Sequence, residues 1–157
     1  MPLVNPVDIS DHNVKELVKF FNETLGFCPN SVLTMQRRPN IAKAFIELNI
    51  AVMENHGELT SELKRLIAFV SSNTAGCRYC QAHTIRAAER YGGSSERLKN
   101  IWDFENQDYF SDAEKAALRF AQEASMIPVN VSAVSYTHLR AHETRGNLVC
   151  RLLLEKK

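Results

Sequence analysis

Two thiols and an imidazole lie within seven residues of one another, at Cys77, Cys80 and His83. On a helix that turns about 100° per residue, Cys77 and Cys80 are about 60° apart on one face, so their sulfurs can form a disulfide. His83 lies about 60° to the other side of Cys80 and reaches that thiol more easily than Cys77. The spacing is therefore that of a dithiol pair with an imidazole in reach of Cys80.

The position of the pair in its helix favours reactive thiols. Unpaired backbone N–H groups and the positive end of the helix dipole stabilise a thiolate in the first turn. Cys77 is best placed for this effect, and Cys80 lies within about the first turn. A thiolate that attacks a peroxide becomes a sulfenic acid, which a neighbouring thiol closes to a disulfide.

A metal site is the first alternative for the cluster. Structural zinc sites have four ligands, usually with a second close pair of cysteine or histidine. The chain has no such pair, because Cys28, His12 and His56 are isolated. We therefore expect neither a metal nor another cofactor.

Two further alternatives concern the cysteines themselves. A thioredoxin-like module places its Cys-x-x-Cys motif after a strand, whereas helical patterns lie on both sides of this one. The cysteines could instead be small packing residues, since free cysteine is often buried for packing alone.

The segments around the cluster show helical periodicity and no strand-like alternation, which predicts an all-α fold. Thr60 or Ser61 can cap a helix that runs to about Thr74, and the cysteine helix ends at the pair Gly92-Gly93. Ser111 to Glu114 has the spacing of a capping box. The other predicted helices cover residues 11–26, 31–38, 41–53 and 94–102.

Composition limits the kinds of partner. A chain of 157 residues is long enough for a core without disulfide staples. Its 19 basic and 18 acidic residues are dispersed, which argues against nucleic-acid binding. No apolar run approaches the roughly 20 residues that span a bilayer, and no signal peptide is visible. We expect a cytoplasmic protein with a small-molecule or protein partner and no membrane contact.

The segments 60–70 (Thr-Ser-Glu-Leu-Lys-Arg-Leu-Ile-Ala-Phe-Val) and 76–83 (Gly-Cys-Arg-Tyr-Cys-Gln-Ala-His) resemble the alkylhydroperoxidase D-like branch of the carboxymuconolactone decarboxylase family. The similarity extends over about residues 41–124. It implies an all-α, alkylhydroperoxidase D-like domain and homo-oligomers, as trimers or hexamers. It also implies reduction of a hydroperoxide substrate, with an external dithiol protein as the reductant.

The resemblance assigns roles to the cluster. Cys80 becomes the attacking thiol, Cys77 the resolving partner and His83 a proton carrier. Two positions depart from the family pattern: Arg65 stands where a relay glutamate is usual, and Thr84 where the histidine is usual. We expect Arg65 to lie on a solvated helix face. The alternatives are a carboxymuconolactone decarboxylase-like lyase, which needs no cysteine pair, and a non-enzymatic redox-sensing or oligomeric module.

The last part of the chain has a different character. Residues 134–144 (Val-Ser-Tyr-Thr-His-Leu-Arg-Ala-His-Glu-Thr) and 148–157 (Leu-Val-Cys-Arg-Leu-Leu-Leu-Glu-Lys-Lys) resemble translated sequencing-adapter sequence that is appended to many unrelated proteins. The resemblance implies a domain at 1–133, incomplete at its C-terminus, and a non-native tail at 134–157. His138, His142 and Cys150 would then carry no evolved chemistry. The alternative is a genuine C-terminal helix that includes residues 148–154.

Overall fold

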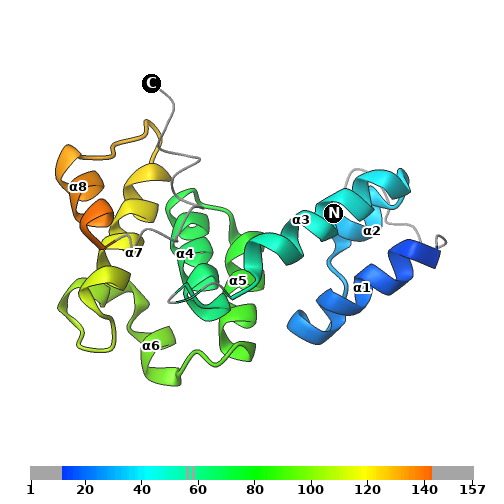
Figure 1. Cartoon of the computed structure of the whole chain (residues 1–157), viewed down its shortest axis with the longest axis horizontal. Helices are drawn as coiled ribbons and strands as arrows, with labels where there is room; N and C mark the ends of the chain where they lie inside the picture. The colour runs from blue at the N-terminus through cyan, green and yellow to red at the C-terminus, as the bar shows by residue number, and fades with distance from the viewer. Residues whose placement is uncertain (1–11, 56, 58, 143–157) are drawn as a thin grey trace. The chain divides into compact units, whose positions relative to one another are not determined.

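The computed structural model describes residues 12–55, 57 and 59–142, and within them the chain is helical without a strand (Figure 1). It divides into two compact units, residues 1–54 and 55–157. The all-α prediction is confirmed. The helices are α1 (His12–Leu25), α2 (Asn30–Met35), α3 (Pro39–Met53), α4 (Ser61–Thr74), α5 (Arg78–Arg90), α6 (Ser95–Lys99), the 3₁₀ helix η1 (Ile101–Asn106), α7 (Asp112–Ala124) and α8 (Ala133–His142).

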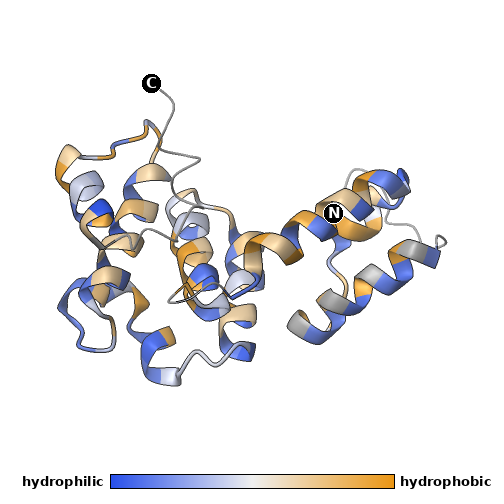
Figure 2. Ribbon diagram, viewed as in Figure 1, coloured by the Kyte–Doolittle hydropathy of each residue, from blue (hydrophilic) through white to orange (hydrophobic). Residues whose placement is uncertain are grey.

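The first unit consists of α1, α2 and α3. Pro39 stands in the first turn of α3, where its missing N–H group costs no hydrogen bond. Phe21 of α1 and Phe45 of α3 stack with their ring centroids 6.4 Å apart. Each helix has a hydrophilic and an apolar side (Figure 2), and the apolar residues that are fully buried are Val14, Val32, Ala42 and Ile46.

The second unit holds the cysteine pair on the α4–α5 hairpin. Its core gathers buried residues from α4, α5, η1, α7 and the segment before α7, and burying each large side chain contributes about 1.5–3 kcal/mol. The members of this core are Leu66, Val70, Ala88, Ile101, Phe104, Phe110 and Leu118. The α4–α5 hairpin is therefore packed against η1 and α7 through this shared core.

Arg97 ties the start of α4 to α7. Its Nε and Nη2 atoms donate to the two carboxylate oxygens of Glu62 at 3.0 and 3.2 Å, and Nη2 also donates to Glu114 at 2.6 Å. Its guanidinium lies 4.7 Å from the centroid of the Phe110 ring. Glu114 in turn completes the capping box with Ser111, as the sequence predicted. This cluster fixes the far end of the hairpin relative to the site.

Helix α8 includes the first residues of the predicted tail. Ser135 and Leu139 are buried, and Ser135 donates to Glu123 of α7 at 2.7 Å. Cys150 and the other residues from 143 onward lie outside the described residues, as does His56. The predicted domain boundary near residue 133 stays a prediction.

Candidate redox site

The turn between α4 and α5 is closed by two backbone hydrogen bonds. The N–H of Gly76 donates to the carbonyl of Asn73 at 2.9 Å, and the N–H of Cys77 donates to the carbonyl of Ser72 at 2.8 Å. This pair of bonds is a Schellman motif, which requires a left-handed residue just after the helix. Gly76 supplies it with a φ of +72°. The glycine thus brings Cys77 directly onto the end of α4.

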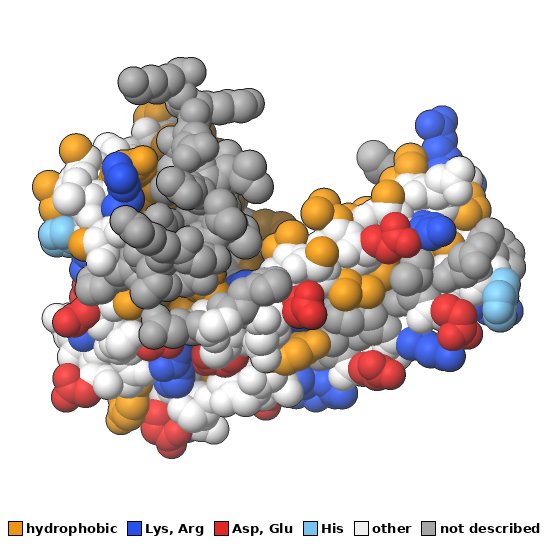
Figure 3. Space-filling model, viewed as in Figure 1, with side chains coloured by type: hydrophobic (Ala, Val, Ile, Leu, Met, Phe, Trp, Pro, Cys, Tyr) orange, Lys and Arg blue, Asp and Glu red, His pale blue; other side chains and the backbone are white. Residues whose placement is uncertain are grey.

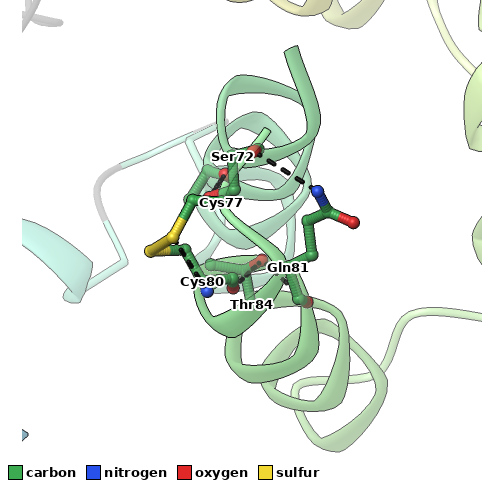
Figure 4. The surroundings of a disulfide bond; sticks show 6 residues. Ser72, Cys77, Cys80, Gln81 and Thr84 are labelled. Carbon is green, nitrogen blue, oxygen red and sulfur yellow. Dashed lines mark hydrogen bonds between the residues drawn. A yellow bond between two sulfur atoms is a disulfide. The ribbon is translucent and has the colours of Figure 1, made fainter. Parts of the chain in front are cut away.

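Cys77 is also the N-cap of α5. Its backbone is extended (φ −83°, ψ 90°), and its sulfur accepts a hydrogen bond from the N–H of Cys80 at 3.3 Å. The sulfur therefore occupies the position where a serine or aspartate oxygen usually caps a helix. The two cysteines form a disulfide, with their Cα atoms 5.4 Å apart (Figure 4). The predicted position of the cysteine pair at the start of a helix is confirmed, and the two cysteine side chains are bonded to each other.

Polar side chains on the hairpin hold the turn in place (Figure 4). Gln81 Nε2 donates to the Ser72 carbonyl at 3.5 Å, so α5 and the Cys77 amide share one acceptor on α4. Thr84 Oγ1 donates to the carbonyl of Cys80 at 2.8 Å. The Thr84 hydroxyl is therefore used within its own helix, which gives it no proton to supply to a thiolate through that contact.

His83 lies one turn after Cys80 and packs on the ring of Tyr79. The ring centroids are 4.1 Å apart, and the Tyr79 side chain is 49% exposed. Burial lowers the pKa of His83, because desolvation disfavours the charged imidazolium. A neutral imidazole near pH 7 can accept a proton. That His83 serves Cys80 in this way stays a prediction.

Arg65 is buried, which corrects the expectation of a solvated face: its relative exposure is 6%. Its guanidinium lies 4.4 Å from the centroid of the Tyr91 ring, and the ring covers one face of the cation. Tyr91 caps the C-terminus of α5, 14 residues after Cys77, or about 20 Å along the helix. Arg65 therefore contacts the C-terminal end of α5, whereas the disulfide lies at the first turn of that helix. The helical pattern did not predict the burial of Arg65, because that burial depends on tertiary packing against Tyr91.

No group of three or more histidine, cysteine, aspartate or glutamate side chains that could hold a metal occurs in the described parts of the chain. Cys28 has a free thiol whose pKa is raised by burial, and it belongs to the first unit.

None of the described helices is both long and apolar enough to cross a membrane. Acidic and basic side chains are interspersed on the face shown in Figure 3.

Comparison with known proteins identifies relatives of this hairpin and its surroundings. A sequence profile of the carboxymuconolactone decarboxylase family matches residues 39–123. The protein YnjA of Escherichia coli K12 is 39% identical over 67 residues, which are 42% of this chain. That match spans only 36% of the length of YnjA.

Solved structures extend the similarity to nearly the whole chain. The debrominase Bmp8 is 30% identical with a TM-score of 0.83, over 95% of this chain and 80% of Bmp8. Bmp8 has also been solved as a cysteine-to-alanine variant in complex with 2,3,4-tribromopyrrole.

More distant structures share the fold. An alkylhydroperoxidase AhpD core protein of Ralstonia eutropha JMP134 is 20% identical, with a TM-score of 0.69 over 92% of this chain and 78% of its own. A peroxidase-related protein of Silicibacter sp. TM1040 is 16% identical, with a TM-score of 0.72 over 94% of this chain and 80% of its own. These two similarities support the all-α fold described above.

Gly76→Ala should lower the free energy of unfolding by about 1–2 kcal/mol, because an L-residue in the left-handed region pays that conformational penalty. Apart from the two neighbours of Gly76 in the chain, no atom of the described residues lies within 4 Å of the added Cβ, so a steric clash contributes nothing. Urea unfolding of the oxidised chain measures the loss. Gly76→Asn is the matched control and should lose less, since asparagine tolerates this conformation. An unfolding free energy for Gly76→Ala equal to wild type would contradict the Schellman assignment.

The lowered pKa of His83 should make the fold sensitive to acid. Because the unfolded chain binds a proton to this imidazole more readily than the folded chain, stability is fully present above the ordinary histidine pKa of about 6.5. It should fall as the pH drops from about 6.5 through the folded pKa. Unfolding free energies at about pH 7.5 and about pH 5 measure this loss. His83→Gln should reduce the loss, and an unchanged pH dependence in that variant would refute the assignment to His83.

Proposed function

The chain belongs to the carboxymuconolactone decarboxylase family, and from this premise we propose that it is a thiol-dependent reductase. The observation that carries the proposal is the Cys77–Cys80 disulfide at the first turn of α5. A dithiol that closes to a disulfide gives up two electrons and two protons. A small substrate with a weak, polarised bond is the matching acceptor.

The first candidate substrate is a hydroperoxide. The Cys80 thiolate attacks the terminal oxygen of the peroxide, the O–O bond breaks, and the alkoxide takes a proton and leaves as an alcohol. Cys80 is then a sulfenic acid. The Cys77 sulfur attacks the Cys80 sulfur, the disulfide forms and water leaves. His83, in its neutral form, takes the Cys80 proton and returns it to the leaving oxygen.

Turnover needs a reductant for the disulfide. An external dithiol protein attacks one sulfur of the pair and leaves with its own disulfide, restoring Cys77 and Cys80 as thiols. Cys77 and Cys80 are both partly exposed, and the intervening Arg78 and Tyr79 are exposed, which supports such access. We also propose a homo-oligomer, a trimer or hexamer, in line with the family resemblance. A cytoplasmic location is a further proposal.

The second candidate substrate is a brominated aromatic ring. The debrominase Bmp8, at 30% identity over 95% of this chain, is the observation that favours it. In the balanced reaction, two thiols and a carbon–bromine bond give a disulfide, a carbon–hydrogen bond and hydrogen bromide. The same cysteine pair therefore serves either electron acceptor, and the choice between them depends on substrate binding.

Replacing each cysteine tests the proposed roles. Cys80→Ser should reduce hydroperoxide consumption at least about a hundredfold, because the attacking thiolate is lost. Cys77→Ser should stop after one turnover with Cys80 trapped as a sulfenic acid, which dimedone labelling and mass spectrometry detect. Cys28→Ser is the control and should keep wild-type activity. Full alkylation of Cys77 and Cys80 after peroxide treatment would refute the mechanism, and activity that survives Cys80→Ser would favour lyase chemistry.

Bromide release distinguishes the second substrate from the first. The reduced chain, incubated with 2,3,4-tribromopyrrole and dithiothreitol, should release one bromide ion for each disulfide formed, as measured by ion chromatography. Cys80→Ser should release no more than dithiothreitol alone. If wild type also fails to exceed the dithiothreitol control while it consumes hydroperoxide, the brominated substrate is eliminated.

A further inference from the structure

An exposed aromatic ring lies against the proposed proton carrier. The ring centroids of Tyr79 and His83 are 4.1 Å apart, with an interplanar angle of 43°. Tyr79 is 49% exposed and is not a member of the buried core of the second unit. Packing of that core therefore does not account for this large aromatic side chain between the two cysteines, whereas its contact with the imidazole does.

Helix geometry places the Tyr79 ring on the side of His83 that faces away from Cys80. At about 100° per residue, His83 projects about 60° to one side of Cys80, and Tyr79 projects about 100° to that same side. Helical side chains also lean toward the N-terminus, over residues i−3 and i−4, which for His83 are Cys80 and Tyr79. Because the Tyr79 ring fills the i−4 side, the imidazole is confined toward the i−3 side, where Cys80 lies.

The other side of Cys80 offers no competing proton carrier on α5. Thr84 projects about 40° to that side. Its hydroxyl shares its one proton between the carbonyl oxygens of Cys80 at 2.8 Å and Gln81 at 3.2 Å. Proton transfer from the Cys80 thiol therefore depends on how often the His83 imidazole is in reach, and confining that side chain to one rotamer raises this fraction.

We propose that Tyr79 is a positioning residue: its ring holds the His83 imidazole beside Cys80, where the imidazole takes the thiol proton. This inference rests on the proposed reductase function, and it gives Tyr79 a task that acts only through His83. The aromatic face makes the contact, and the hydroxyl is not needed for it. Phenylalanine should therefore replace tyrosine at this position, and alanine should not.

The test measures alkylation of Cys80 by iodoacetamide in the full chain with Cys77→Ser, in which the disulfide cannot form. Serine is a good helix cap, so α5 keeps its first turn. Iodoacetamide reacts with the thiolate, and peptide mass spectrometry gives the rate at Cys80. Tyr79→Ala should lower this rate about threefold or more at about pH 7 and leave it unchanged at about pH 10, where a thiol of ordinary pKa, about 8.5, ionises without a base.

Two further variants control for the loss of an exposed side chain. Tyr79→Phe should keep the unsubstituted rate at both pH values. Tyr109→Ala removes a tyrosine of similar exposure, 46%, from the segment before α7, and it should change neither rate. A Tyr79→Phe chain that behaves like Tyr79→Ala would overturn the proposal. An equal change at both pH values in Tyr79→Ala would also overturn it, because a disturbed helix would then explain the result.

A double-mutant comparison shows whether Tyr79 acts through His83. His83→Gln should lower the rate at about pH 7 by itself, and adding Tyr79→Ala to it should lower the rate no further. An unchanged rate in either single variant, or an additional loss in the double variant, contradicts the proposal. In the reduced wild-type chain, nuclear Overhauser contacts should join the imidazole protons both to the Tyr79 ring and to the Cβ protons of Cys80. Absence of the contacts to Cys80 would count equally against it, even where Tyr79→Ala folds poorly.

Turnover assays separate this result from the reductase proposal. With both cysteines present, Tyr79→Ala should reduce kcat/KM for hydroperoxide at least about fivefold, a part of the roughly 10²–10⁴-fold that a positioned base contributes. If wild type turns over neither hydroperoxide nor 2,3,4-tribromopyrrole, the proposed function fails. The alkylation rates then still decide whether Tyr79 positions His83 beside Cys80.

Discussion

The candidate site depends on Cys77 belonging to two helices at once. Its backbone N–H closes the Schellman motif at the end of α4, and its sulfur caps the first turn of α5. Because the two functions come from one residue, the backbone that carries this sulfur cannot move without disturbing the hairpin. The position of the disulfide is therefore set by the turn that joins the helices, and Gly76 makes that turn possible.

The rest of the second unit contacts this hairpin in two places, through the apolar core and through the charged cluster around Arg97. The apolar core packs Leu66, Val70 and Ala88 of the hairpin against η1 and α7. The cluster around Arg97 ties the first turn of α4 to α7 through partly buried charges, whose loss costs more than that of exposed ion pairs. The turn that joins α4 to α5 carries the disulfide, at the other end of the hairpin. The stabilising ion pairs of Arg97 and the cysteine pair thus lie at opposite ends of α4.

Local patterns predicted the helices and the cysteine pair, because caps, glycine stops and apolar spacing act over a few residues. Ser111 and Glu114 formed the expected capping box, and Thr60 capped α4. The environment of Arg65 could not be predicted in this way, since its burial depends on Tyr91, 26 positions later in the chain. The bond from Gln81 to Ser72 likewise requires the hairpin to be closed first. A charged residue in a helical pattern indicates solvent only when no distant side chain covers it.

The cap geometry also bears on which sulfur does which task. The N–H of Cys80 points at the Cys77 sulfur, so a thiolate at Cys77 is stabilised more than one at Cys80. A stabilised thiolate is a better leaving group and a weaker nucleophile at equal thiolate fraction. Under the proposed mechanism, Cys80 then attacks the substrate, and Cys77 leaves when an external thiol attacks the Cys80 sulfur of the disulfide. The helix effect that at first favours Cys77 as the reactive thiol is therefore consistent with Cys80 as the attacking residue.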